Sequence, residues 1–141
     1  MVSFVNAIYA LNGEYIDPTM LARYSNSHGH YFYMQGTADT LYEDFARAKG
    51  KFYHFKWDGK IYDMTSLKKH LQNGGTAVAL VPGHYIAIAE YRESRQQLSC
   101  TGFCHLRQAA YHYSTATGSA KEPCEAGTLY CSYFHLFSRV K

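Results

Sequence analysis

The chain has 141 residues, 47% hydrophobic and 18% charged, which is enough for one domain with its own core and too little for two ordinary ones, so a single domain is predicted over residues 1–141. The formal net charge of +3 is spread thinly, and Lys68–Lys69 is the only adjacent basic pair, so nucleic acid is not an expected partner. The longest apolar stretches, 76–81 and 85–89, are far shorter than the ~20 residues of a membrane-spanning helix, so no membrane span is expected.

Two helices are predicted near the start of the chain. Apolar residues recur with helical spacing at Met1, Phe4, Val5, Ile8 and Leu11. This first helix starts without a visible cap and should end at Asn12–Gly13. Asp17–Pro18 is typical of an N-cap followed by proline at the first helical position, and Leu21 and Tyr24 would form the inner face of the second helix.

A third helix is predicted from Thr37 onward. The stretch 25–37 is loop-like in its first half. The helical spacing then resumes at Ala38, Leu41, Tyr42, Phe45 and Ala48. Lys49–Gly50 should end this helix, with the glycine in a left-handed cap.

The second half of the chain favours strands. A short strand is predicted at 52–55, then a turn at 57–60 and a brief helix at 65–75 that Gly74–Gly75 closes. Strands at 76–81 and 84–91 follow, separated by Pro82–Gly83. Both are almost continuously apolar, so each should be covered on both faces, with the side chains of His84, Ile86 and Ile88 on one of them. A last strand is predicted at 128–139.

The order of these elements indicates an α+β fold, with helices packed on a small antiparallel sheet. Residues 94–125 show neither helical nor strand periodicity, which is unusual for a small domain. One interpretation is a variable loop, with or without a disulfide from Cys100 to Cys104 or Cys124. The other is that about 95–125 are translated out of frame: with one choice of codons, removing a nucleotide after Ser94 gives Ser-Asp-Asn-Ser-Tyr-Leu-Val-Leu-Asp-Ser-Ala, a strand followed by an aspartate.

The sequence leaves the location of the protein open. The first residues lack the basic leader and cleavage site of a secretory signal, so either the protein stays inside the cell or this chain lacks its front end. All four cysteines, Cys100, Cys104, Cys124 and Cys131, follow residue 99, and their number does not settle the redox compartment. No oligomeric state can be assigned.

His84 is the candidate catalytic residue, because the Pro82–Gly83 break leaves it at the free start of a strand. The alternative is a histidine that only begins a buried strand and bonds locally. The other histidines are expected to be solvated; these are His28, His30, His54, His70, His105, His112 and His135.

Other kinds of site are less well supported by the sequence. A zinc site could draw on Cys100, Cys104, His105, Cys124 and Cys131. Only the first two cysteines have the spacing of a zinc-binding pair, and the sequence contains no second pair with this spacing. No metal and no cofactor are therefore expected. Neither a phosphate-binding loop nor a nucleophile elbow is present.

Several segments together resemble the papain-like cysteine peptidases of the bacteriocin-processing type, which cleave double-glycine leaders. They are NAIYALNGEYIDPTMLARYSN, the helix ending AKG, and LKKHLQNGGTAVALVPGHYIAIAEY, with GTLYCSYFHLFSRV as a closing strand. The resemblance covers 1–91 and, more weakly, 127–140. It implies a papain-like fold with the first helix on the sheet and His84 facing the front end of that helix.

The resemblance also implies a reaction, and it implies that the nucleophile for this reaction is missing from the chain as given. In this family a cysteine opens the first helix within Gly-Cys-Gly-x-Val-Ser, and this chain begins at x, so its nucleophile would lie two residues before Met1. His84 would act as general base and then acid on a peptide or protein substrate. An aspartate or asparagine on the strand after the His84 strand should orient the ring. The irregular segment 94–125 occupies the position in the sequence where that strand is expected. The chain as given is therefore expected to be inactive; the alternative is a module that binds peptides or a cell-envelope partner without cutting them.

Overall fold

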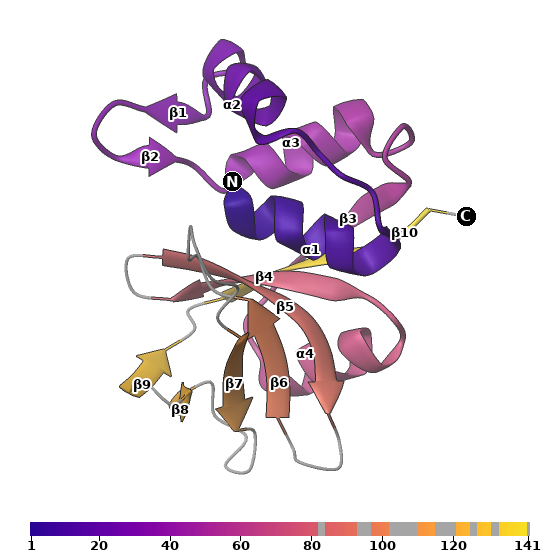
Figure 1. The fold of residues 1–141 in the computed structure, drawn as a ribbon, viewed down its shortest axis with the longest axis vertical. Helices are drawn as coiled ribbons and strands as arrows, with labels where there is room; N and C mark the ends of the chain where they lie inside the picture. Colours follow the sequence, from indigo (N-terminus) through magenta and orange to yellow (C-terminus); the bar gives the residue numbers. More distant parts are fainter. Residues whose placement is uncertain are drawn as a thin grey trace.

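A computed structural model of the chain describes the backbone of residues 1–81, 84–92, 97–101, 110–114, 121–124, 127–130 and 133–140. Side chains are described over the same residues, except at position 64, from 81 to 84 and from 91 to 132. Within this part of the chain the fold is α+β, with helices on both faces of an antiparallel sheet (Figure 1). The fold class expected from the order of the elements is thus confirmed at this coarse level.

Three helices cover one face of the sheet: α1 (Val2–Asn12), α2 (Pro18–Ser27) and α3 (Thr40–Lys49). The α1 helix lies directly on the sheet, and α2 and α3 lie above it (Figure 1). The N-cap residue of α1 is Met1, which makes no side-chain capping bond, and the helix ends at Gly13, whose φ of 79° is left-handed. The side chain of Asp17 accepts a hydrogen bond from the Thr19 N–H, which caps α2 as predicted.

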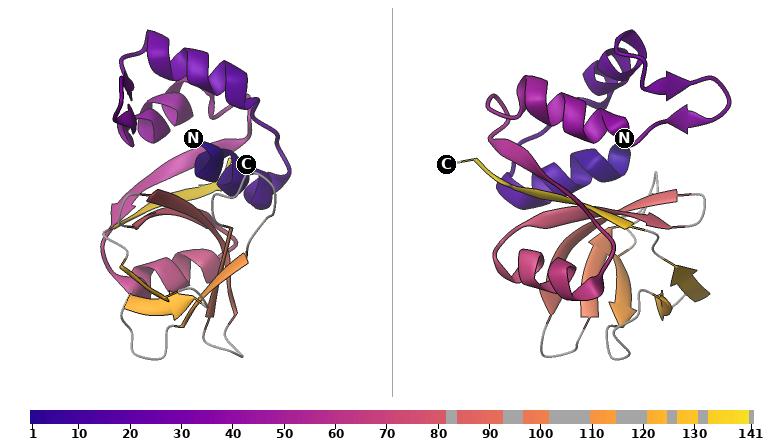
Figure 2. Two further views of the ribbon diagram at one scale, coloured as in Figure 1. Left: turned by 60° about the vertical axis from the view of Figure 1, so that its left-hand side comes forward. Right: turned by 180° about the vertical axis from the view of Figure 1, so that it is seen from behind.

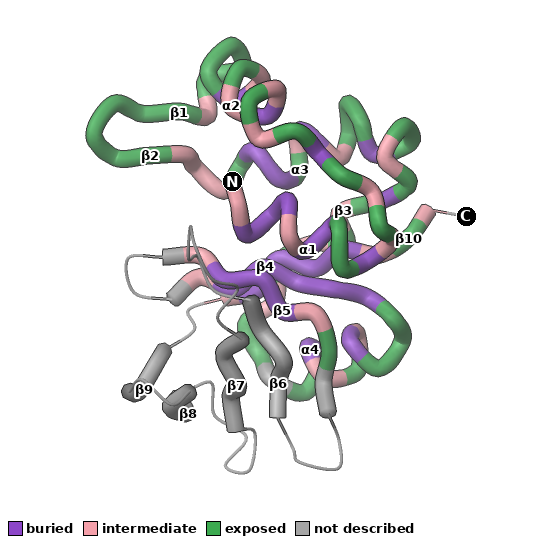
Figure 3. Tube along the Cα trace, viewed as in Figure 1, coloured by how far each residue is buried: buried purple, intermediate pink, exposed green. Residues whose placement is uncertain are grey.

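The core lies between α1, α3 and the sheet, and Phe4 is at its centre. The ring of Phe4 is fully buried and its centroid is 5.1 Å from Tyr42, 5.9 Å from Phe45 and 5.3 Å from Phe137. These partners come from α3 and from a strand near the end of the chain, so one side chain joins segments far apart in sequence. Figure 3 shows the inner side of α1 and the adjoining strands as the buried part of the molecule.

The main sheet has six strands in the order β3-β10-β4-β5-β6-β7, and every pair of neighbours is antiparallel. The strands are β3 (Phe55–Ile61), β4 (Thr76–Val81), β5 (His84–Arg92), β6 (Gln97–Thr101), β7 (Ala110–Ser114) and β10 (Tyr133–Arg139). Helix α4 (Met64–Gln72) covers the face opposite α1 (Figure 2). The central strands β4 and β5 contact both α1 and α4, as their unbroken apolar sequences predicted.

Two short antiparallel pairs complete the described fold. The strands β1 (Tyr31–Phe32) and β2 (Gly36–Thr37) form a hairpin beside α2, and β8 (Lys121–Cys124) pairs with β9 (Gly127–Tyr130). The segment 94–125, expected to be irregular, therefore contains the strands β6, β7 and β8. The single last strand predicted at 128–139 is divided between β9 and β10.

Three local predictions are wrong. Residues 25–27, expected in a loop, form the last turn of α2. Of the strand predicted at 52–55, residues 52–54 form a turn and only Phe55 belongs to a strand, as the first residue of β3; the turn predicted at 57–60 lies within β3. The Asp58–Gly59 pair does not reverse the chain because β3 pairs with β10, where the register shifts opposite Gly59 and φ at that glycine is 106°.

Gly50 also differs from its prediction, because it adopts ordinary right-handed helical angles with φ of −59°. A Cβ atom at this position would come within 3.0 Å of the carbonyl oxygens of Ala46 and Phe55. Glycine is therefore required here by the close approach of the backbone where α3 leads to β3.

Candidate functional site

The front end of α1 is held against the start of β5. The buried Ser3 hydroxyl, in the first turn of α1, donates a hydrogen bond of 2.5 Å to the carbonyl oxygen of Tyr85. One turn further along the same face of α1, the Thr76 hydroxyl donates to the Ala7 carbonyl at 2.9 Å. These two bonds fix both the direction of α1 and its height over the sheet.

The first turn of α1 contains no acidic side chain and no side-chain cap. Met1 is the N-cap residue and makes no side-chain capping bond, and no acidic residue lies in the first turn. The first N–H groups of a helix lack intrahelical partners and carry the positive end of the helix dipole. This end of α1 can therefore stabilise an anion.

His84 begins β5, where its backbone pairs with Val81 in β4. It directly precedes Tyr85, the residue that binds Ser3. The imidazole of His84 lies outside the described side chains, so its predicted direction stays a prediction. The same holds for the zinc hypothesis, because the side chains of Cys100, Cys104, His105, Cys124 and Cys131 lie outside them too.

Among the side chains that the structure describes, no group of three or more histidine, cysteine, aspartate or glutamate residues is arranged to hold a metal ion.

A chain of polar side chains runs from Tyr85 to the edge strand β3. The hydroxyls of Tyr85 and Tyr133 hydrogen-bond to each other, and Tyr133 donates to Asp39 Oδ2 at 2.7 Å. The same oxygen accepts from His135 Nε2 at 3.0 Å. On the far side of its ring, His135 Nδ1 accepts a hydrogen bond of 3.0 Å from the Trp57 indole.

This chain fixes the protonation of its members. Because the Trp57 N–H can only donate, His135 Nδ1 must be unprotonated, and the proton that faces Asp39 is on Nε2. Burial lowers the pKa of His135, although the hydrogen bond to Asp39 opposes this shift. Burial alone would raise the pKa of Asp39, but hydrogen bonds from Tyr133 and His135 and the nearby Lys60 charge lower it. At neutral pH the pair is therefore a neutral imidazole and a carboxylate.

The burial of His135 corrects the expectation that it is solvated. Its side chain is only 3% exposed, and it lies between Phe134 and Leu136 in a strand with neighbours on both sides. The apolar residues around it in the sequence were the available signal, since a histidine inside such a strand is usually covered. Its partners Asp39 and Trp57 could not be identified from the sequence, because they are distant along the chain.

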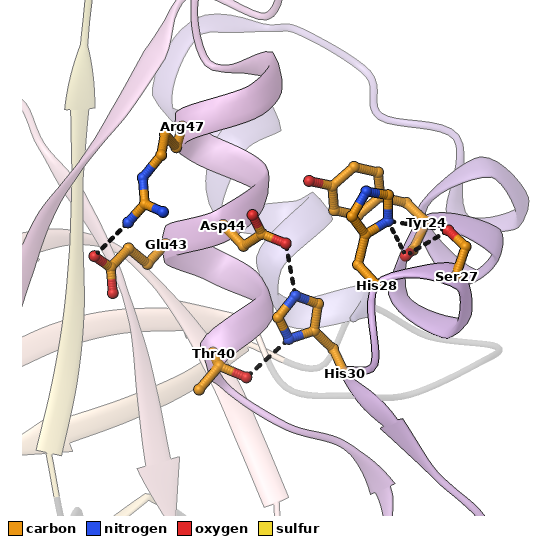
Figure 4. A network of polar contacts seen from close by, with 8 residues as sticks. All are labelled: Tyr24, Ser27, His28, His30, Thr40, Glu43, Asp44 and Arg47. Atoms are coloured by element: carbon orange, nitrogen blue, oxygen red, sulfur yellow. Dashed lines mark hydrogen bonds and ion pairs between the residues drawn. The ribbon is translucent and has the colours of Figure 1, made fainter.

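A second histidine, His30, fixes the β1–β2 hairpin to α3 (Figure 4). Its Nε2 is 2.7 Å from Asp44 Oδ2, and its Nδ1 is 2.9 Å from Thr40 Oγ1. The hydrogen bond from His30 lowers the pKa of Asp44. The Ala38 N–H donates to the His30 carbonyl at 2.7 Å, which closes the base of the hairpin. His30 too was expected to be solvated, and only 12% of its side chain is exposed.

Two cavities adjoin these groups. A cavity of about 270 Å³ lies at the front end of α1 and is lined by Met1, Ala22, Ser25, Asn26, Tyr31 and Thr37. Another, of about 240 Å³, lies between α3 and β3 and is lined by Asp39, Thr40, Glu43, Trp57, Lys60 and His135. The first is beside the end of α1 that can stabilise an anion, and the second is at the far end of the polar chain.

Comparison with known proteins finds no family model, no curated protein and no solved structure that matches this chain.

None of the helices within the described residues has the length and apolar character needed to cross a membrane.

Proposed function

We propose that this chain is a papain-like cysteine-peptidase domain related to the bacteriocin-processing peptidases, with His84 as its catalytic histidine. Hydrolysis of a peptide bond then requires a thiol just ahead of α1. The 141 residues contain no cysteine before Cys100, so by themselves they are expected to leave peptides uncut.

The observation that carries the proposal is the hydrogen bond from Ser3 to the Tyr85 carbonyl. It holds the first turn of α1 within one residue of His84 along β5. A thiolate at the start of α1 would meet unpaired N–H groups and the positive end of the helix dipole, with no carboxylate in the first turn to oppose it. An imidazolium nearby lowers a thiol pKa further, into the range of about 3.5 to 7.5.

In the proposed reaction, His84 takes the proton of the thiol, and the thiolate attacks the carbonyl carbon of the peptide. The imidazolium then returns its proton to the leaving amine, and an acyl-enzyme forms. Water, deprotonated by the same imidazole, releases the acid and restores the thiol. The tautomer of the His84 ring depends on the residue that orients it.

Peptide cleavage by an extended variant tests this proposal. Gly-Cys-Gly placed directly before Met1 restores the family pattern, and a Gly-Ser-Gly extension is the matched control. With the reading of 94–125 repaired if the gene shows a shifted frame, the cysteine variant should cut members of a peptide library, while the serine variant and the chain as given should not. Cleavage by the unextended chain would contradict the proposal.

The gene sequence itself tests the frame hypothesis. The codons from Ser94 to Cys104 should permit the shifted reading that gives a strand followed by an aspartate. An uninterrupted frame with codons that forbid this reading would leave 94–125 as a genuine variable segment.

The exposed hairpin favours a second candidate, a module that binds peptides or a cell-envelope partner without cutting them. Tyr33 and Met34 at its tip are 82% and 84% exposed, and Tyr31 and Phe32 are about half exposed. Contiguous exposed apolar side chains often mark interaction sites. Binding of library peptides by the extended variant without any turnover would favour this candidate over hydrolysis.

A further inference from the structure

The cavity at the front end of α1 has walls from three elements. Met1 comes from the start of α1, Ala22 from the middle of α2, and Tyr31 from the first strand of the hairpin. Tyr31 and Thr37 are paired across β1 and β2, so both side chains lie on the same face of the hairpin and both line the cavity. Met1, Ala22 and Tyr31 make the apolar part of the lining, and Ser25, Asn26 and Thr37 add polar groups.

The wall that the hairpin contributes is held in place. Directly before Tyr31, His30 is bonded through both ring nitrogens to Asp44 and Thr40 of α3 (Figure 4). The hydrogen bond from Ala38 to the His30 carbonyl closes the base of the hairpin beside this anchor. The cavity is thus bounded by α1 and α2 on one side and by an anchored hairpin on the other.

We propose that this cavity is a specificity subsite that takes one large apolar side chain, such as leucine or phenylalanine, of an extended peptide. The inference rests on the proposed function, and it names the class of substrate. Met1 lines the cavity and is also the N-cap residue of α1, so a residue in the cavity is next to the position where the thiol would act.

The size of the cavity decides between a large and a small side chain. A volume of about 270 Å³ is several times the roughly 30 Å³ that one water molecule occupies in the liquid. A glycine would leave it filled with water against Ala22 and the half-exposed ring of Tyr31. A leucine would displace that water and bury apolar surface, with a gain of about 10- to 200-fold per added methylene group in a closely fitting pocket. Substrates of this chain are therefore expected to differ from a plain pair of glycines.

The experiment uses the chain as given, because binding needs no thiol. Three blocked tripeptides, acetyl-Gly-X-Gly-amide with X as Leu, Phe or Gly, are titrated into the ¹⁵N-labelled chain, and the amide signals of Ala22 and Thr37 are followed. The Leu or Phe peptide should bind at least ~10-fold more tightly than the Gly peptide and should shift both signals. Equal affinities, or shifts confined to other parts of the chain, would overturn the proposal.

A pair of substitutions on α2 separates the cavity from the surrounding surface. Ala22→Leu fills the cavity with a side chain of the size proposed for the ligand, and it should weaken binding of the Leu peptide at least ~10-fold. Arg23→Leu adds the same side chain at the next, exposed position and should leave the affinity within about 2-fold. If the two variants behave alike, the subsite is not this cavity.

Cleavage by the Gly-Cys-Gly variant distinguishes failure of the subsite from failure of the proposed function. Binding of the Leu peptide at Ala22 and Thr37, with no cleavage of any library peptide, would contradict the peptidase and support the subsite as a binding site. Cleavage without preference for a large apolar residue would contradict the subsite alone.

Discussion

At the residue scale, His135 and Asp39 show how burial and hydrogen bonding act against each other. The imidazole is covered by the sheet and by Tyr42, whose ring centroid is 4.9 Å away, and it stays neutral because Trp57 occupies Nδ1 as a donor. The carboxylate keeps its charge because Tyr133 and His135 donate to it and Lys60 lies 3.4 Å away. The pair thus connects α3 to β10 without placing an uncompensated charge in the interior.

The lowered pKa of His135 predicts a loss of stability in mild acid. The folded chain resists protonation at this ring, so below the ordinary pKa of 6.5 the unfolded chain binds more protons than the folded chain. Stability that is present above pH 6.5 should therefore fall as the pH falls toward the lower, folded pKa. Asp39, whose pKa is held below 3.8, should add a second loss below that pH.

Urea unfolding at about pH 7 and about pH 5 measures this effect. The loss of free energy of unfolding between the two pH values should be smaller in His135→Gln than in the parent chain. An equal pH dependence in the parent and in His135→Gln would contradict the role given to this ring.

At the scale of single elements, the helices follow local signals and β3 does not. Asp17–Pro18 starts α2 where the sequence predicts it, because the capping bond to Thr19 is formed within three residues. In β3, the local signal of Asp58–Gly59 favours a turn, but pairing with β10 extends the strand through it. Strand pairing depends on a partner that comes much later in the chain, so local sequence could not reveal it.

The cap of α2 gives a prediction for this element. Asp17→Ala removes the acceptor for the Thr19 N–H and should lower the free energy of unfolding by about 1 kcal/mol. Asp17→Asn keeps an acceptor at the same place and should lose much less. The two variants are compared by their urea midpoints, and equal losses would show that the charge of Asp17, rather than its hydrogen bond, matters.

At the junction of α3 and β3, replacement of glycine by alanine is expected to destabilise the protein, where it would normally stabilise it. Replacing glycine by alanine at a position with helical angles normally stabilises a protein by about 0.4–1 kcal/mol. Gly50→Ala should instead destabilise it by about 1–3 kcal/mol, because the new Cβ would collide with the carbonyl oxygens of Ala46 and Phe55. A thermal midpoint at or above that of the parent would show that the backbone can move aside.

At the scale of the whole molecule, one buried face joins α1, α3, β3 and β10. Phe4 contacts Tyr42, Phe45, Phe55 and Phe137, and all five residues are at most 2% exposed. The helical spacing of the first residues identified Phe4 as a core residue. The aromatic partners from the sheet could not be identified in this way, because they meet only when the strands are assembled.

Truncation of Phe4 measures this central packing. Phe4→Ala should lower the free energy of unfolding by about 3–5 kcal/mol, since the cavity would be enclosed by four rings that cannot all move in. Tyr9→Ala removes a ring of similar size from the 60% exposed position on the same helix and should change stability by only about 0.5 kcal/mol. Similar losses in both variants would contradict the position of the core.

The candidate site could be predicted from the sequence only in part. Gly83–His84 at the start of a strand, and the uncapped first turn of the opening helix, are both local features that the sequence displays. Their proximity depends on the bond between Ser3 and Tyr85, which no local pattern indicates. The cavity beside Met1 likewise needs α2 and the hairpin to come together, and the anchoring of His30 on α3 was not foreseen.

The central claim is that the imidazole of His84 lies beside the start of α1 and lowers the pKa of a thiol there. The most direct measurement is the rate of alkylation of the Gly-Cys-Gly thiol as a function of pH, followed on the N-terminal peptide by mass spectrometry. The thiol should titrate between about 3.5 and 7.5, and His84→Ala should move it toward the ordinary ~8.5, whereas His54→Asn should not. A thiol that titrates near ~8.5 in the extended parent, or that does not respond to His84→Ala, would contradict the account.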